Sequence, residues 1–458
     1  MKIKAFIASA ALMASLALSA QQAKYIFYYI GDGMGMGPSV SAETYNRVVR
    51  GNSTPLTMMQ MPVVGWCMTY SASSPVTDSA AAGTALSTGY KTLNGMLGMT
   101  PDSTAVTSVA VDLAKMGYGI GVATSVAPDD ATPGAFFAHV PSRKMSYEID
   151  CQMAESGYNF VAGGGLRGLT KDGKDTDALE RFQKNGVQIV YGPDEIEKIT
   201  SDKVVLLNPK GAPSGNVGYT IDSIAGVLNL PLIAETCLKQ LERTSPDKFF
   251  MMIEGGNIDH ALHANDGGAA VKEIVNFNQA LDVAFEFYKK HPDETLIVVT
   301  ADHDTGGMSL NAHNEKGLFY IDLQKISKEE FNGYCKSLLK SRNVYTWDDM
   351  RQYLADNLGL FRVIPVSGEK EAELKDMFDR TFNLRNTADQ KTLYANFNAF
   401  AVDVFKIFND AVGFRFTATG HSGNPVPVFA IGVGADRLKG FNNNTDIPGI
   451  ILEAAKGK

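Results

Sequence analysis

The amino-acid sequence predicts an α/β protein with a central, mostly parallel sheet, helices on both faces of that sheet, and a helical or irregular insertion. The first observation is a set of recurring apolar runs, at residues 24–30, 120–123, 249–253, 296–300 and 428–433. The second is a helical pattern between these runs, clearest at residues 271–290. Continuously apolar strands that alternate with amphipathic helices are typical of a parallel sheet buried on both faces.

The first 20 residues have the layout of a cleavable secretory signal. Lys2 and Lys4 precede an apolar run at residues 5–18, and the small residues Ser19 and Ala20 follow it. We therefore expect cleavage after Ala20 and export to the periplasm or the extracellular space. The run is shorter than the roughly 20 apolar residues that span a bilayer, and no later stretch predicts a membrane span.

Composition and charge narrow the class of partner. The 458 residues carry a formal net charge of −8, which argues against a nucleic acid partner because phosphate backbones bind to basic surfaces. An acidic protein can still act on phosphates if its carboxylates hold metal cations. The cysteines leave two interpretations open, namely up to two disulfides or buried free thiols. They are Cys67, Cys151, Cys237 and Cys335.

The stretch at residues 311–416 differs from the rest of the chain. It is charged, favours helices and is rich in aromatic residues, and it separates Asp302 and His303 from the final apolar run. We expect an insertion that caps or flanks a site. The alternative is a set of peripheral helices with no part in catalysis.

Carboxylates end or follow three of the apolar runs, at Asp32, Glu254 and Asp302. Ligands of open parallel sheets bind beyond the carboxyl ends of the strands. After Glu254, Asp259 and His263 are four residues apart and therefore share one face of a helix. A carboxylate and an imidazole at that spacing suit zinc.

Two further segments carry histidines. Asp302 and His303 precede a pair of glycines, which suggests a metal held at a sharp turn, although an ordinary polar loop is the alternative. His421 stands before the last apolar run. Four of the seven histidines of the chain lie in these three segments, namely His260, His263, His303 and His421.

Ser79 stands at the start of an Ala-rich, helix-favouring segment. The free N–H groups and the dipole of a helix N-terminus favour anions such as phosphate. Plain N-capping by Asp78 or Ser79 is the alternative. Metal ions near Ser79 would favour a nucleophilic role, because they activate a hydroxyl at neutral pH.

Oxygen ligands and a cation follow at residues 129–143. The side chains of Asp130 and Thr132 suit a hard ion such as magnesium. Arg143 could grip a phosphate through two parallel hydrogen bonds, which Lys cannot do. A surface arginine is the alternative for this residue.

Six of these segments stand in the order of the motifs of the alkaline phosphatase family, which the chain closely resembles. They are residues 31–35, 77–81, 130–133, 254–263, 300–303 and 420–421. The resemblance covers roughly residues 24–307 and 416–436. It implies that residues 21–458 form an alkaline phosphatase-like catalytic domain, with a cap-like insertion at about residues 311–416.

The resemblance also implies two zinc ions, one magnesium ion and their ligands. One zinc would be bound by Asp259, His263 and His421. The second zinc would be bound by Asp32, Asp302, His303 and the Ser79 oxygen. The magnesium would be bound by Asp32, Thr132 and Glu254, with Asp130 reaching it through water.

The implied function is hydrolysis of small-molecule phosphate monoesters through a phosphoserine on Ser79, with Arg143 holding the non-bridging oxygens. The resemblance also favours a homodimer. His260 departs from the best-known bacterial pattern, which has Lys at this position. Because a neutral imidazole cannot replace a fixed ammonium, we expect an altered phosphate affinity and a different preference at the third metal site.

Two alternative functions stand beside this one. A phosphodiesterase of the same superfamily would share the scaffold, although Arg143 favours monoesters. A sulfatase would need a C/S-x-P/A-x-R signature, which none of the cysteines has, and the export signal disfavours a mutase that acts on cytosolic metabolites. From a different class, a non-catalytic phosphate- or metal-binding protein would bind phosphate without turnover.

Overall fold

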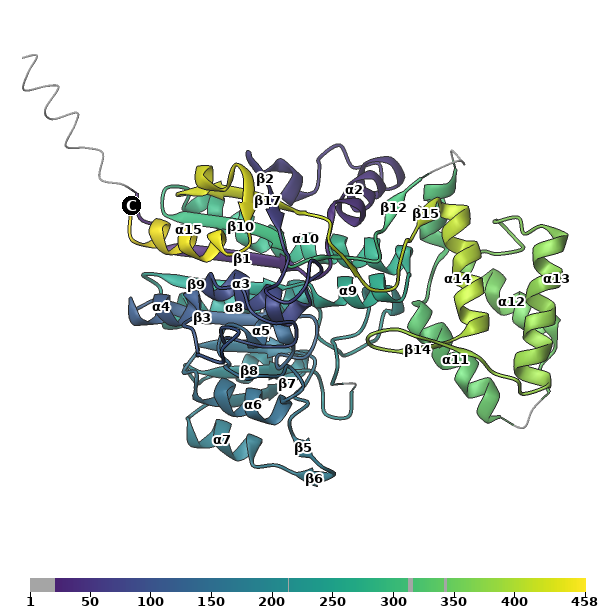
Figure 1. Ribbon diagram of the computed structural model, residues 1–458, viewed down its shortest axis with the longest axis horizontal. Helices are drawn as coiled ribbons and strands as arrows, with labels where there is room; N and C mark the ends of the chain where they lie inside the picture. The colour runs from purple at the N-terminus through teal and green to yellow at the C-terminus, as the bar shows by residue number, and fades with distance from the viewer. Residues whose placement is uncertain (1–20, 213, 312–315, 342–343) are drawn as a thin grey trace, which may run out of the picture.

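The computed structural model describes residues 21–212, 214–311, 316–341 and 344–458. The predicted secretory signal, residues 1–20, lies outside the described residues. The described chain is built around one large twisted sheet with helices on both sides, and a group of helices stands to one side of it (Figure 1).

The large sheet has ten strands in the order β18-β2-β17-β10-β1-β9-β3-β4-β8-β7. All pairs of neighbouring strands are parallel except those of β17, which is antiparallel to both β10 and β2. All five apolar runs predicted as strands belong to this sheet, so the predicted fold class is confirmed. The strands are β1 (Tyr25–Gly31), β2 (Val63–Met68), β3 (Gly119–Thr124), β4 (Phe160–Gly163), β7 (Gln188–Tyr191), β8 (Val204–Leu207), β9 (Phe249–Glu254), β10 (Thr295–Ala301), β17 (Val426–Gly432) and β18 (Gly440–Asn443).

Helices cover both faces of the sheet. One face carries α2 (Met36–Thr44), α8 (Leu230–Thr244) and α10 (Gly267–Lys290), and the other carries α3 (Ser79–Thr88), α4 (Val109–Lys115) and α15 (Asp446–Ala455). The predicted helix at residues 271–290 lies within α10. The remaining helices beside the sheet are α5 (Ala131–Gly134), α6 (Ser146–Glu155), α7 (Ala178–Lys184) and α9 (Gly256–His263).

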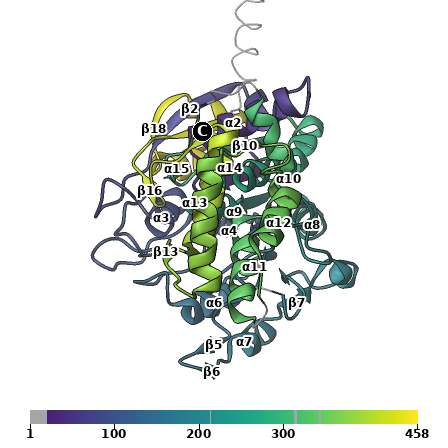
Figure 2. The same cartoon turned by 90° about the vertical axis from the view of Figure 1, so that its right-hand side faces the viewer.

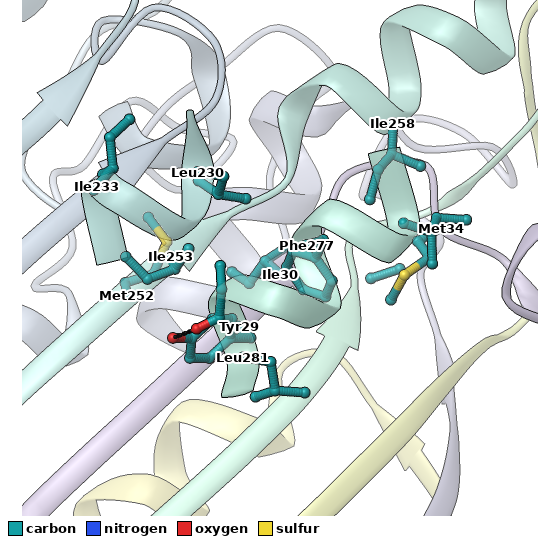
Figure 3. Close-up of a cluster of buried hydrophobic side chains, with 14 of the residues drawn as sticks. Tyr29, Ile30, Met34, Leu230, Ile233, Met252, Ile253, Ile258, Phe277 and Leu281 are labelled. Atoms are coloured by element: carbon teal, nitrogen blue, oxygen red, sulfur yellow. Dashed lines mark hydrogen bonds between the residues drawn. The ribbon is translucent and has the colours of Figure 1, made fainter. Parts of the chain in front are cut away.

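Two adjacent tyrosines of β1 show how the central strands are buried on both sides. The Tyr29 hydroxyl donates to the Ala280 carbonyl in α10, at 2.8 Å. The hydroxyl of the preceding residue, Tyr28, donates to the Leu86 carbonyl in α3 on the opposite face, at 3.4 Å. Successive side chains of a strand point to opposite faces, and Figure 3 shows Tyr29 among the apolar side chains that α10 contributes. This double burial explains why β1 reads as an unbroken apolar run.

The insertion forms the side group of helices, which Figure 2 shows standing in front of the rest of the chain. It contains α11 (Lys328–Lys340), α12 (Trp347–Leu358), α13 (Gly368–Phe378), α14 (Ala399–Val412), β13 (Asp389–Lys391) and β14 (Asn396–Asn398). Buried polar contacts fix it to the main body. The Asp266 carboxylate accepts hydrogen bonds from the Lys328 backbone N–H and the Gln324 side chain, and Asp222 accepts two from Ser327, the N-cap of α11.

Short elements complete the chain. The two-residue strands are β5 (Thr170–Lys171), β6 (Lys174–Asp175), β11 (Asp304–Thr305), β12 (Ser309–Leu310), β15 (Phe414–Arg415) and β16 (His421–Ser422). Short helices of the 3₁₀ or π type lie at Tyr45–Val49, Thr57–Gln60, Pro193–Lys198, Thr220–Asp222, Gly317–Leu323, Asp379–Asn383 and Ala435–Leu438. The thiols of all four cysteines are free, and only Cys151 is not fully buried. Among the helices of the described residues, none combines the length and the apolar content needed to cross a bilayer.

Candidate active site

The carboxyl ends of three neighbouring strands supply the core of the site. Asp32 follows β1, Glu254 is the last residue of β9, and Asp302 follows β10. These strands lie side by side in the order β10-β1-β9. Their ends are level, because Ile30 pairs with both Glu254 and Thr300. The sheet therefore places the three carboxylates next to one another at one edge.

Asp259, His263 and His421 form one cluster of ligand-type side chains, whose ligand atoms all lie within 4.8 Å of one another. Asp259 and His263 share a face of α9, and His263 Nε2 lies 3.3 Å from Asp259 Oδ2. His421 arrives from a distant part of the sequence, because β16 pairs with β11 and sets His421 opposite Thr305. Its Nε2 lies 3.0 Å from His263 Nε2.

Asp32, Asp302 and His303 form the second cluster, with ligand atoms again within 4.8 Å of one another. His303 Nε2 lies 3.4 Å from Asp32 Oδ1 and 3.2 Å from Asp302 Oδ2. The same nitrogen lies 3.1 Å from Ser79 Oγ. The imidazole planes of His303 and His421 are stacked, with ring centroids 3.6 Å apart, so the two clusters adjoin each other.

The hydrogen bonds of the three histidines determine which ring nitrogen is free. His263 Nδ1 lies 2.5 Å from the Thr419 carbonyl oxygen, and His421 Nδ1 lies 2.8 Å from the Thr77 carbonyl oxygen. A carbonyl only accepts, so both Nδ1 atoms carry a proton, and in the neutral imidazoles, the form that binds metals, both Nε2 atoms keep a lone pair. Two facing lone pairs 3.0 Å apart repel each other unless a cation lies between them.

Thr305 orients the third histidine and links the two clusters. Its hydroxyl donates to Asp259 Oδ1 at 2.5 Å. Because its hydrogen is already used in that bond, the hydroxyl oxygen acts as the acceptor for the Nδ1–H of His303, 3.1 Å away in the second cluster. His303 Nε2 is thereby left as a lone pair that faces Ser79 and the two carboxylates. Such outer contacts fix the tautomer and orientation of metal-binding histidines.

Several buried oxygens at the site accept no hydrogen bond from any described residue, although buried polar atoms are nearly always paired. They are Asp32 Oδ1, Asp259 Oδ2, Asp302 Oδ2 and Thr132 Oγ1. Burial, reinforced by neighbouring carboxylates, raises the pKa of both Asp32 and Asp302 well above the usual range. Divalent cations would satisfy these oxygens and neutralise the carboxylates, so the donor set fits the metal ions of the predicted sites.

The side chains of Thr132 and Asp32 lie within interaction distance of the Glu254 carboxylate. Thr124 donates a hydrogen bond to Glu254 Oε2, and burial raises the pKa of Glu254 to about 7, against the lowering effect of Thr132 and Asp32. These side chains offer only oxygen ligands, as a hard cation such as magnesium requires. Asp130, the remaining predicted member, is the N-cap of α5 and accepts from the Ala131 N–H at 2.7 Å.

Ser79 is the first residue of α3, and its side chain is fully buried. The preceding Asp78 is the N-cap, because its carboxylate accepts from the Ala81 N–H at 3.0 Å. Capping is therefore the role of Asp78, and the Ser79 hydroxyl points towards His303 instead. This arrangement puts one hydroxyl between the helix N-terminus and the second cluster.

Two arginines hold Asp130. Arg143 Nη2 donates to Asp130 Oδ1 at 2.9 Å, and its Nη1 lies 3.4 Å from Asp78 Oδ2. Arg167, which sequence reasoning missed, donates to Asp130 Oδ2 at 3.2 Å and to the buried Asp129 Oδ1 at 3.0 Å. Two adjacent carboxylates, Asp129 and Asp130, need more than one positive charge to neutralise them, and this pair in the sequence could have indicated a second basic residue. Arg143 lies in the site and is not an isolated surface arginine.

His260 contacts the insertion through Tyr394. Burial lowers the pKa of its imidazole to about 4, against the opposing effect of Asp130, so this side chain is neutral at neutral pH. Its ring lies against the Tyr394 ring, with centroids 3.9 Å apart. Tyr394 is a second residue that sequence reasoning missed, because nothing in its neighbours along the chain points to the site.

Comparisons with known proteins show the family of the chain. The family model for alkaline phosphatase matches residues 23–457. Alkaline phosphatase 4 of Bacillus subtilis is 29% identical over 451 residues, which cover 94% of this chain and 88% of the relative. Alkaline phosphatase of Escherichia coli is 29% identical over 339 residues, or 62% of this chain and 71% of the relative.

Solved structures give the same result for the fold. The cold-active alkaline phosphatase of a psychrophilic Shewanella superposes with a TM-score of 0.78 at 27% identity, covering 94% of this chain and 99% of that one. The enzyme of the Antarctic bacterium TAB5 superposes with a TM-score of 0.65 at 26% identity, covering 96% and 100%. Fold and family together define a metal-dependent hydrolase of phosphoric monoesters. The chain belongs to the alkaline phosphatase family, as the motifs predicted.

Proposed function

We propose that this protein hydrolyses small phosphate monoesters through a phosphoserine on Ser79, with two zinc ions and one magnesium ion as cofactors. The observation that carries the proposal is the position of Ser79 Oγ, 3.1 Å from His303 Nε2. That nitrogen belongs to a cluster of unpaired carboxylate oxygens, and a second such cluster adjoins it. A buried hydroxyl beside these unsatisfied ligand atoms supports a nucleophilic role for Ser79 better than a purely structural one.

The family resemblance and the donor sets support the following ligands for each ion. Asp259, His263 and His421 would hold the first zinc, because a carboxylate and two imidazoles leave a fourth position open. The second zinc would be held by Asp32, Asp302, His303 and the Ser79 oxygen. The magnesium would be held by Asp32, Thr132 and Glu254, with Asp130 reaching it through water. When bound, these ions supply positive charge for the transferring phosphoryl group and lower the pKa of hydroxyl groups beside them.

The residues of the chain then carry the reaction in two displacements. Ser79 Oγ releases its proton to solvent and bonds to phosphorus, while the ester P–O bond breaks and the leaving oxygen takes up a proton from solvent to depart as the alcohol. Arg143 binds two non-bridging oxygens of the phosphoryl group, and the α3 N-terminus turns its free N–H groups towards the same charge. Water then attacks phosphorus from the side that the alcohol vacated. Inorganic phosphate leaves, and the Ser79 hydroxyl is restored.

A monoester fits this site better than a diester. Arg143 offers two donors to two charged oxygens, and a diester carries a substituent on one of them. We therefore expect a kcat/KM for a monoester well above that for its methyl diester, and a ratio near one would favour the phosphodiesterase alternative. A non-catalytic role is not supported, because the nucleophile and all the predicted ligands are present and the relatives are named as enzymes.

Export and assembly complete the proposal. We infer that residues 1–20 are removed after Ala20 and that the mature enzyme works in the periplasm or outside the cell. We also infer a homodimer. N-terminal sequencing of the protein recovered from the exported fraction tests the first inference, and light scattering of the mature holoenzyme tests the second.

The decisive experiment compares the holoenzyme with Ser79→Ala, with and without a chelator. The wild type should form a phosphoserine that survives acid quenching and maps to the peptide containing Ser79. Chelation should abolish turnover, and zinc with magnesium should restore it. Ser79→Ala should lose at least about 1,000-fold in kcat, while its folding stays unchanged. Turnover of the Ser79→Ala protein within about tenfold of wild type would reject the phosphoserine.

A further inference from the structure

A hairpin of the insertion reaches the site. Strands β13 and β14 pair in antiparallel fashion, and their connecting loop, residues 392–395, forms the tip. The tip is closed by hydrogen bonds between Thr392 and Ala395. Its base is fixed to α11, because Asn332 donates to the Asn396 carbonyl at 3.0 Å and accepts from the Asn398 N–H at 2.9 Å. Asn332 therefore anchors the β14 side of the hairpin to α11.

Leu393 and Tyr394 lie at this tip. The Tyr394 ring packs on His260 and meets His263 edge-on, with ring centroids 5.2 Å apart. The two side chains nevertheless keep large open surfaces, 57% of Leu393 and 37% of Tyr394. The two residues therefore present apolar surface to solvent next to the site.

Both side chains line a cavity of about 610 Å³, whose wall also includes the residues around the proposed phosphate position. Arg143, Asp78 and Asp130 line the same cavity. A phosphoryl group held by Arg143 would therefore direct its ester substituent into a space with one apolar wall. Ligand pockets commonly combine such an apolar wall with a few polar groups that fix orientation.

We propose that Leu393 and Tyr394 form a leaving-group wall that selects phosphate monoesters whose alcohol carries an aromatic ring. This inference rests on the proposed function and adds the class of substrate. An aromatic ring buries apolar area against Leu393 and meets the Tyr394 ring in an offset or edge-on contact, which together favour aryl over small alkyl groups. The insertion thereby takes a direct part in substrate choice.

The test compares ligands that differ only in the ring. Benzyl phosphate and ethyl phosphate release alcohols of similar basicity, so the ratio of their kcat/KM values reports recognition. Benzylphosphonate and ethylphosphonate cannot be hydrolysed, and calorimetry on the metal-loaded enzyme reports their binding without turnover. We expect the wild type to prefer the aromatic member of each pair by roughly tenfold.

The variants assign that preference to the wall. The double variant Leu393→Ala with Tyr394→Ala should remove most of the aromatic preference and leave ethylphosphonate affinity and zinc content unchanged. Tyr394→Phe should keep it, because the ring and not the hydroxyl makes the contact. The single variant Leu393→Ala should lose part of the aromatic preference. Tyr90→Ala, at an exposed tyrosine outside the cavity, should match the wild type.

The outcomes separate this inference from the function on which it rests. The proposed leaving-group wall is rejected if the double variant keeps the aromatic preference, or if it binds both phosphonates more weakly by the same factor. A wild type that hydrolyses monoesters without any aromatic preference also overturns it, while leaving the proposed function intact. A holoenzyme that neither binds phosphonates nor hydrolyses monoesters overturns both.

Discussion

Ser79 Oγ lies 3.1 Å from His303 Nε2, although 224 residues separate the two along the chain. The contact joins the N-terminus of α3 to the turn after β10. It places the candidate nucleophile at the edge of the cluster that contains His303. The other cluster is adjacent, because the ring of its member His421 stacks on the His303 ring. The arrangement makes several consequences measurable.

The hydroxyl of Thr305 couples the two clusters, so its removal should weaken metal binding at both. In Thr305→Val, the hydrogen bond to Asp259 and the acceptor for His303 Nδ1–H are both lost. We expect zinc affinity to fall about 10- to 100-fold, as for other contacts that orient metal ligands. Zinc retained during dialysis against a competing chelator measures it. Thr305→Ser keeps the hydroxyl and is the control, and equal zinc retention in Val and wild type would contradict the coupling.

Arg143 should bind phosphate through its geometry and not only through its charge. Arg143→Lys keeps the charge but loses the paired donors, so the inhibition constant of inorganic phosphate should rise about tenfold. Lys144→Ala removes a neighbouring exposed charge that lines the same cavity and should change that constant less than about twofold. Competitive inhibition of monoester hydrolysis by phosphate measures both. Equal effects of the two substitutions would point to general electrostatic attraction.

His260 should set how tightly the product is held. Its imidazole is neutral at neutral pH, so His260→Lys introduces a fixed positive charge beside Asp130 and the phosphate position. We expect phosphate inhibition to become about tenfold stronger, because a close charge pair in a partly buried site contributes on the order of 1 kcal/mol or more. His260→Gln, a neutral variant, separates charge from the lost packing on Tyr394. If Lys and Gln variants give the same product inhibition and metal dependence, the hypothesis is wrong.

The buried Lys328 should make the stability of the insertion depend on pH. Its ammonium donates to the Ala264 carbonyl at 2.8 Å, and burial lowers the pKa of Lys328 from 10.5 to about 8. Between those two values the unfolded chain binds more protons than the folded chain, so the free energy of unfolding rises with pH in that window. Below about pH 8 both states bind the proton, so the free-energy cost of burying the charged Lys328 ammonium is then fully present.

The variant Lys328→Met lacks this titration. Relative to the variant, the wild type should therefore gain roughly 2 kcal/mol of unfolding free energy between about pH 8 and pH 10. Urea unfolding of the metal-saturated proteins at both pH values measures the change. Lys340→Met, at an exposed lysine of the same helix, is the control and should show no such gain. A constant difference between wild type and Lys328→Met across this range would contradict the prediction.

Local pattern was sufficient for much of the site. A strand buried on both faces must be apolar throughout, so β1, β9 and β10 could be located and the carboxylates at their ends identified. The four-residue spacing of Asp259 and His263 fixed their common face, because a helical turn has a constant period. The same motifs gave the family, which the comparison over residues 23–457 confirmed.

Contacts between distant segments could not be read in this way. Only the β11–β16 pairing shows that His421 meets His263, 158 residues away. Arg167 was missed because a single arginine after a strand has no distinguishing neighbours, and Tyr394 because nothing in a short loop indicates which distant segment it will contact. Which interpretation of the cysteines holds was also decided by packing, which leaves the four thiols free.

The sequence by itself determined the type of each element and the chemistry available at its ends, because periodicity and residue type act over a few neighbouring positions. The tertiary structure decided that β17 runs antiparallel, that Thr305 joins the two clusters, and that the insertion brings Tyr394 against His260. Those relationships depend on how sheets and helices pack over hundreds of residues, and no local pattern encodes that packing.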